Sequence, residues 1–99
     1  MKLVITEGAW QSLDRLQKYW ARFTADDRVE ERVGHLIDEA TWLCKWPGAG
    51  AQEPFFLRHR KAYRRWVVGQ IKIVYRIDGD TLYVLDFFDS RQRPRRMKR

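Results

Sequence analysis

Apolar residues in the first part of the chain recur every three or four positions. The series consists of Trp10, Leu13, Leu16, Trp20 and Phe23. Because this spacing places side chains on one face of a helix, it predicts an amphipathic helix from Glu7 to Phe23. Thr6 lies just before it and is the expected N-cap.

A second apolar series with the same spacing follows. It consists of Val29, Val33, Leu36, Ile37, Ala40, Leu43 and Cys44. Thr24 and Asp27 resemble a capping box at its start, and Pro47-Gly48 marks its end. The connection between the two helices is short, so we expect an antiparallel hairpin whose apolar stripes cover a sheet. His35 falls within the second helix, where a structural or surface role is expected.

The second half of the chain alternates with a period of two. It predicts three antiparallel strands at Phe56–Val68, Ile71–Asp78 and Thr81–Asp89. The Asp78-Gly79 turn is a strong hairpin signal because glycine accepts the positive φ that a tight turn needs. Lys2–Ile5 is expected to join these strands at an edge.

The predicted fold class is therefore α+β. It comprises an N-terminal strand, an antiparallel two-helix hairpin and a three-stranded antiparallel meander that together form one twisted sheet. Residues 1–92 are expected to be a single domain, with residues 93–99 as a basic tail that is mobile in isolation.

Alternation also predicts which side chains face the helices. In the second meander strand, Lys72 and Arg76 should point away from the core. In the third, the expected core set is Tyr83, Leu85 and Phe87, which leaves Leu82, Val84 and Phe88 on the open face. An apolar open face among basic residues is a candidate binding surface, unless the N-terminal strand or a second copy covers it.

Charge is distributed unevenly along the 99 residues, whose net charge is +7. Residues 1–54 hold 7 Lys/Arg and 9 Asp/Glu, whereas residues 55–99 hold 13 Lys/Arg and 4 Asp/Glu. The second half is expected to meet a polyanion or an acidic protein, although a solubilising surface would look similar. The sequence has no apolar run of about 20 residues for a membrane span and no secretory signal. Together with the single Cys44, this favours the cytoplasm.

Two motifs in the last third resemble the RelE/ParE toxins of type II toxin–antitoxin modules. From Arg64 to Arg76, the residues R…VGQIKIVYR are similar to the family's R…VG-x-x-R-I-I-Y-R strand pair. From Phe88 to Pro94, FDSRQRP is similar to its F-D-[ST]-R-Q-N-P ending. The layout of the whole chain fits the family, and residues 63–94 carry the specific likeness.

This resemblance implies a candidate active site. Lys72, Arg64, Arg65 and Arg91 fall at positions where ribonuclease members carry catalytic cations. Lys72 departs from the family's Arg, because an ammonium is a point charge and lacks the guanidinium's planar fork of donors. Glu53 lies directly before Pro54, as the catalytic Glu does in one branch of the family. A loop carboxylate without a catalytic role would give the same sequence pattern. The general acid has no clear counterpart.

Further cations are expected to bind RNA around this site. They are Arg58, His59, Arg60, Lys61, Arg76, Arg95 and Arg96. His59 could supply a proton because its pKa is ordinarily near neutrality, but the neighbouring cations disfavour its charged form.

The family resemblance implies three alternative functions. The first is a ribosome-dependent mRNA interferase, a metal-independent endoribonuclease that needs no cofactor. The second is a non-catalytic inhibitor of DNA gyrase like the ParE members, and the third is a non-toxic protein with the toxin fold. The implied partners are an acidic antitoxin, the ribosome and mRNA or else gyrase, and operator DNA only through the toxin–antitoxin complex.

Overall fold

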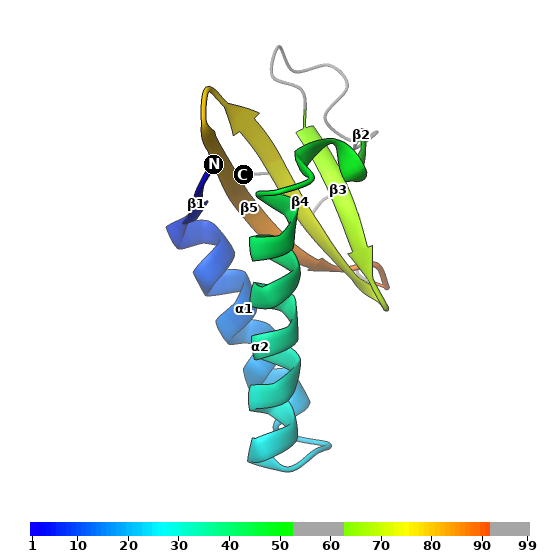
Figure 1. Ribbon diagram of the computed structural model, residues 1–99. Helices are drawn as coiled ribbons and strands as arrows, with labels where there is room; N and C mark the ends of the chain where they lie inside the picture. Colours follow the sequence, from blue (N-terminus) through cyan, green and yellow to red (C-terminus); the bar gives the residue numbers. More distant parts are fainter. Residues whose placement is uncertain (53–62, 92–99) are drawn as a thin grey trace.

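The structure, a computed structural model, describes residues 1–52 and 63–91. A single mixed sheet carries a helix hairpin on one face (Figure 1). The elements in chain order are β1 (Lys2–Ile5), α1 (Glu7–Trp20), α2 (Asp26–Leu43), the 3₁₀ turn η1 (Pro47–Ala49), β2 (Ala51–Gln52), β3 (Tyr63–Val68), β4 (Ile71–Asp78) and β5 (Thr81–Asp89). The α+β class and the order of its elements are therefore confirmed.

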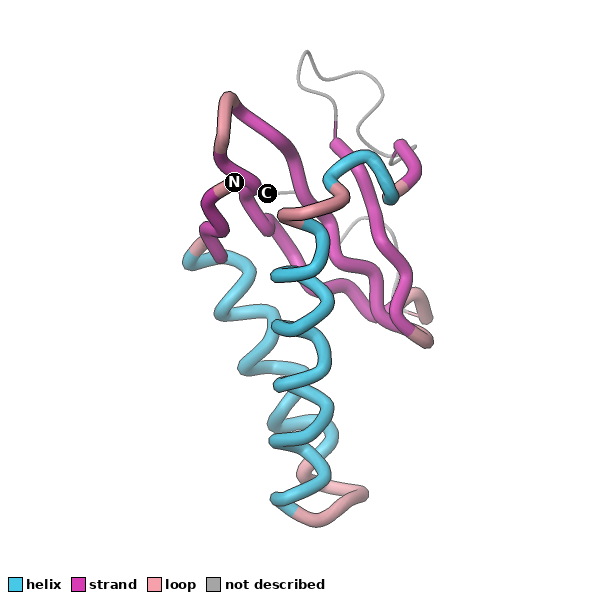
Figure 2. The backbone as a smooth tube through the Cα atoms, viewed as in Figure 1, coloured by secondary structure: helices cyan, strands magenta, loops and turns pink. Residues whose placement is uncertain are grey.

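The strands lie in the order β1-β5-β4-β3-β2. β1 runs parallel to β5, and the pairs β5–β4, β4–β3 and β3–β2 are antiparallel. The backbone trace in Figure 2 shows the two helices running side by side in opposite directions and extending past the sheet. The bounds of β1, β4 and β5 match the predicted ones. β2 was not predicted, and the part of the first predicted meander strand before Tyr63 lies outside the described residues.

Thr6 caps α1 and also ties it to the sheet. Its side-chain oxygen accepts a hydrogen bond from the Ala9 N–H at 3.2 Å, and its hydroxyl donates to the Val84 carbonyl of β5 at 2.9 Å. The predicted N-cap is thus confirmed. The helix ends at Trp20, earlier than predicted, and Phe23 is 71% exposed.

The predicted cap of α2 is wrong. Ala25, not Thr24, occupies the N-cap position, and it makes no side-chain capping bond. Thr24 is still part of the turn that closes α1, because its N–H donates to the Trp20 carbonyl at 3.0 Å. Asp26 and Asp27 in the first turn instead favour the helix start by placing negative charge at its positive end.

A β-bulge in β5 corrects the predicted faces of that strand. Val74 pairs with Asp86 and Tyr75 with Val84, so Leu85 is an extra residue without a partner on β4. A bulge of this kind reverses the alternation of side chains along the strand. The inner side of β5 therefore changes from even to odd positions after Asp86, whose carboxylate still contacts α1, so that Phe87 lies in the core.

This reversal decides which apolar residues are buried under the helices. Leu82 and Val84 were predicted on the open face, but they are 0% exposed in the helix-facing core. Tyr83, predicted in the core, is only half-buried and pairs with Arg76. Phe87 in the core is confirmed, and Phe88 lies in a separate cluster, as predicted.

A buried polar contact fixes α1 against β5. The Ser12 hydroxyl donates to the Asp86 carboxylate, and Arg15 donates to the Ser12 oxygen at 3.1 Å. Ser12 and Asp86 are 4% and 2% exposed. Since a buried carboxylate is costly unless it is hydrogen-bonded, this contact favours one position of α1 on the sheet.

Tyr75 anchors the connector that follows α2. Its ring is fully buried, its hydroxyl donates to the Pro47 carbonyl at 2.7 Å, and its oxygen accepts from the Gly50 N–H at 3.0 Å. A Cβ at Gly50 would collide with this hydroxyl and with the Arg65 carbonyl. The connector therefore approaches β3 closely only because residue 50 is glycine.

We predict that Tyr75→Phe lowers the free energy of unfolding by about 1–3 kcal/mol, because it leaves the buried Gly50 N–H and the partly buried Pro47 carbonyl without their partner. Tyr83→Phe is the control. No described hydrogen bond involves its hydroxyl, so its effect should stay within about 0.5 kcal/mol. Urea denaturation of both variants measures the difference, and equal stabilities would contradict the anchoring role of Tyr75.

Candidate functional site

Three cations lie on the face of the sheet that points away from the helices, here called the open face. Residues that pair across neighbouring strands share a face. Lys72 pairs with Phe88, Arg65 with Val74, and Arg76 with both Tyr63 and Tyr83. The predicted outward orientation of Lys72 and Arg76 is confirmed.

Aromatic rings hold two of these cations. The Arg76 guanidinium carbon lies 4.4 Å from the centroid of the Tyr83 ring, and the Lys72 ammonium lies 5.7 Å from that of Phe88. Such cation–π contacts contribute about 0.5–1 kcal/mol at exposed sites. Arg76 also forms an ion pair with Asp78 at 3.3 Å. The open face therefore presents oriented cations beside rings, an arrangement suited to a phosphate backbone or an acidic protein.

The neighbours Arg64 and Arg65 point to opposite faces of β3 because successive strand residues alternate. Arg65 belongs to the open face, and its guanidinium donates to the Gln52 carbonyl at 3.0 Å. Arg64 pairs with the buried Tyr75 and donates to the Gly50 carbonyl at 2.7 Å. Only one member of this arginine pair therefore lies with Lys72.

Arg91 also lies away from Lys72. It follows β5 and binds Asp89 through two parallel hydrogen bonds, Nε to Oδ1 at 3.1 Å and Nη2 to Oδ2 at 2.7 Å. Asp89 pairs with Ile71, whose side chain belongs to the helix-facing core. The four cations predicted to be catalytic are thus not gathered at one point: Lys72 and Arg65 lie together, whereas Arg64 and Arg91 do not.

The ion pair between Arg91 and Asp89 shifts the pKa of both side chains. Hydrogen bonds from Arg91 hold the pKa of Asp89 below its ordinary value of 3.8, against the opposing effect of burial. The same bonds raise the pKa of Arg91. Asp89 is only 5% exposed, so Arg91 satisfies a carboxylate that would otherwise be buried without a counter-charge.

Seven predicted site residues lie outside the described part of the chain. They are Glu53, Arg58, His59, Arg60, Lys61, Arg95 and Arg96. Their roles stay predictions. Among the described residues, no three His, Cys, Asp or Glu side chains are grouped so that they could hold a metal ion.

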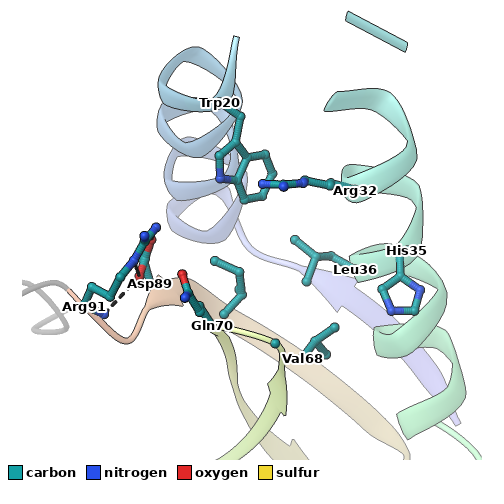
Figure 3. Close-up of a pocket in the computed structure, with 10 residues that line it drawn as sticks. Trp20, Arg32, His35, Leu36, Val68, Gln70, Asp89 and Arg91 are labelled. Carbon is teal, nitrogen blue, oxygen red and sulfur yellow. Dashed lines mark hydrogen bonds and ion pairs between the residues drawn. The ribbon is translucent and has the colours of Figure 1, made fainter. Parts of the chain in front are cut away.

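Two features were missed by the reasoning from sequence. Tyr83 was expected in the core, so its ring was not recognised as the support for Arg76. A cleft on the helix side was not predicted either. It contains Trp20, Arg32 and His35 beside Asp89 and Arg91 (Figure 3). Its residues come from α1, α2 and the ends of three strands, and no local pattern connects them.

Comparison with known proteins identifies the fold. No family model and no curated protein sequence matches this chain. A solved structure described as "Chromosomal ParDE TA system from P. aeruginosa" contains a chain similar to it, with a TM-score of 0.75 and 16% sequence identity. The match covers 90% of this chain and 95% of that chain. The chain has a fold found in a ParDE toxin–antitoxin system. The RelE/ParE-like architecture expected from the motifs is thereby confirmed. None of the described helices could cross a membrane.

We predict that Asp89→Asn lowers the free energy of unfolding at neutral pH and that the loss shrinks under acidic conditions. The folded-state pKa of Asp89 is depressed, so its stabilising contribution is complete above the unfolded value of 3.8 and disappears as the pH falls through the lower folded value. Urea denaturation of wild type and variant between pH 7 and pH 2 measures this convergence. Asp38→Asn on the exposed side of α2 is the control. A difference between wild type and Asp89→Asn that is independent of pH would contradict the linkage.

Proposed function

We propose that this chain is the toxin of a type II toxin–antitoxin pair and that it inhibits growth by binding a macromolecular target through the open face. The observation that carries the proposal is the row Arg65, Lys72 and Arg76 on a fold shared with a ParDE system. Two of these cations are oriented by rings, so the surface is arranged before a target arrives.

Target binding without cleavage is the function that the geometry supports best. RNA cleavage through the 2′-hydroxyl needs a base, an acid and cations around one phosphate. Lys72 and Arg91 lie on opposite faces, and the histidine of the described chain, His35, is on α2. This arrangement favours a non-catalytic inhibitor of DNA gyrase, the ParE-like alternative of the sequence reasoning.

An mRNA interferase is the second candidate. It is supported by the row of Arg65, Lys72 and Arg76 beside the half-buried ring of Tyr83, because cations beside a ring suit the phosphates and stacked bases of a single strand. In this mechanism the cations would stabilise the charge that develops on the phosphate. Glu53 would be the candidate base, whereas the sequence leaves the general acid without a clear counterpart and gives His59 as an RNA contact.

We also propose that an acidic antitoxin binds the open face and thereby inhibits the toxin. The positive charge of residues 55–99 favours an acidic partner, and the exposed Val67, which pairs with Lys72, adds apolar surface to the open face. A partly disordered acidic segment can cover both features when it folds on binding.

We predict that Lys72→Glu and Arg76→Glu each raise the amount of protein needed for growth inhibition about ten-fold or more, since each reverses a charge that contacts the target. Lys18→Glu is the matched control. It makes the same charge change on α1, where Lys18 is exposed and pairs with Asp14. Growth is measured after induction without the antitoxin, at expression levels equalised by immunoblot.

The same variants distinguish the two candidate targets. Purified protein is tested for inhibition of gyrase supercoiling, and host mRNA is mapped by primer extension after induction. Blocked supercoiling with intact mRNA supports target binding without cleavage. In-frame cuts in translated messages would instead support the mRNA interferase. Full toxicity of both Lys72→Glu and Arg76→Glu would contradict the role of the open face.

A further inference from the structure

The cleft on the helix side has a volume of about 480 Å³ and lies between α2, the β3–β4 turn and the end of β5 (Figure 3). Its buried residues are Trp20, Leu36, Ile71 and Asp89. Its exposed residues include Arg32, His35, Gln70 and Arg91. The cleft thus joins a mainly apolar floor to a rim of hydrogen-bond donors, on the opposite side of the sheet from the open face.

We propose that this cleft binds an acidic peptide segment of a partner protein, with one aliphatic side chain on the floor and a carboxylate at Arg32. This site is separate from the surface to which the target binding was assigned above. Peptide binding in the cleft does not depend on whether the open face binds gyrase or mRNA.

Arg32 is oriented to receive a carboxylate. Its guanidinium carbon lies 5.3 Å from the centroid of the Trp20 ring. Stacking on a ring uses the flat face of the guanidinium and leaves the N–H groups at its edge available for a two-pronged bond to a carboxylate. None of the ion pairs within residues 1–52 and 63–91 involves Arg32.

Charge and shape favour an acidic ligand with an apolar anchor. Two guanidinium groups and one carboxylate line the cleft, which gives it a net positive charge with His35 neutral. Asp89 is already bound to Arg91, so its negative charge is compensated. Val68 at the edge of the floor is only half-buried, so an apolar side chain of the ligand would cover apolar surface that the cleft still exposes.

The same residues argue against a nucleic acid in this cleft. A phosphodiester backbone has few donors and no apolar side chain, so it matches neither the Gln70 side-chain oxygen nor the apolar residues of the cleft. A peptide brings N–H groups that can bond to the Asp89 carboxylate and to the Gln70 side-chain oxygen. Trp20, the aromatic residue of the cleft, is only 6% exposed, so its ring offers little surface on which a base could stack.

The proposal is tested with a panel of fluorescein-labelled 12-residue peptides in which one Leu is flanked by Asp and Glu. Binding to the full chain is followed by fluorescence anisotropy. Matched panels replace the acidic residues by Gln and Asn, or the Leu by Ser. We expect the acidic panel to contain binders, and either replacement to weaken them about ten-fold.

Single substitutions test whether the peptide binds in the cleft. Arg32→Glu should weaken the best peptide about ten-fold or more, and Arg32→Lys, which keeps the charge but loses the fork, should weaken it less. Lys45→Glu is the matched control, since it makes the same charge change just beyond the other end of α2. Amide shifts of Gly69 and Gln70 on titration report the site directly. Thermal unfolding verifies that each variant is folded.

Three results would overturn the proposal: no acidic peptide binds, Lys45→Glu weakens binding as much as Arg32→Glu, or a 12-nucleotide single-stranded RNA displaces the peptide in a manner that depends on Arg32. The outcome is independent of the proposed target binding. Arg32 lies in the cleft and not on the open face, so dependence of binding on Arg32 separates the two sites, and failure of the toxicity tests would leave the peptide result intact.

Discussion

The extra residue in β5 determines which side chains each face of the sheet presents. Because Leu85 has no partner on β4, the strand turns Val84 toward the helices before the bulge and Phe87 toward them after it. The same shift places Tyr83 and Phe88 on the open face, where their rings support the two cations of β4. The core and the basic surface therefore depend on one irregularity of the backbone, of a kind often found near functional sites.

The sequence predicted the elements well because helical and strand periods differ clearly in it. Thr6 could be recognised as a cap from its position, and the Asp78-Gly79 turn from its composition. The faces of β5 could not be predicted, because the apolar run from Leu82 to Phe88 is interrupted only at Asp86, so it fits either alternation. The carboxylate at this interruption is hydrogen-bonded to Ser12, a partner 74 residues away, and no local pattern shows that contact.

The candidate site was predicted only in part for a related reason. A motif identifies residue types along the chain, but the direction of each side chain depends on register. Arg64 and Arg65 were both expected at catalytic positions, yet one supports the connector at Gly50 and the other lies with Lys72. Arg91 is directed to Asp89 by a charge that burial makes costly to leave unpaired.

The two surfaces meet at the end of β5. Phe88 faces Lys72 on the open face, and its neighbour Asp89 faces the cleft, where Arg91 holds it. Rigid packing of this strand end therefore serves both surfaces, since one backbone segment positions the two side chains. Tyr83 lies beyond the bulge, so its contact with Arg76 is separated from the cleft by the break in register. A ligand that shifts Asp89 should consequently affect the Lys72 half of the open face more than the Arg76 half, which provides a physical route for coupling between a partner peptide and the target surface.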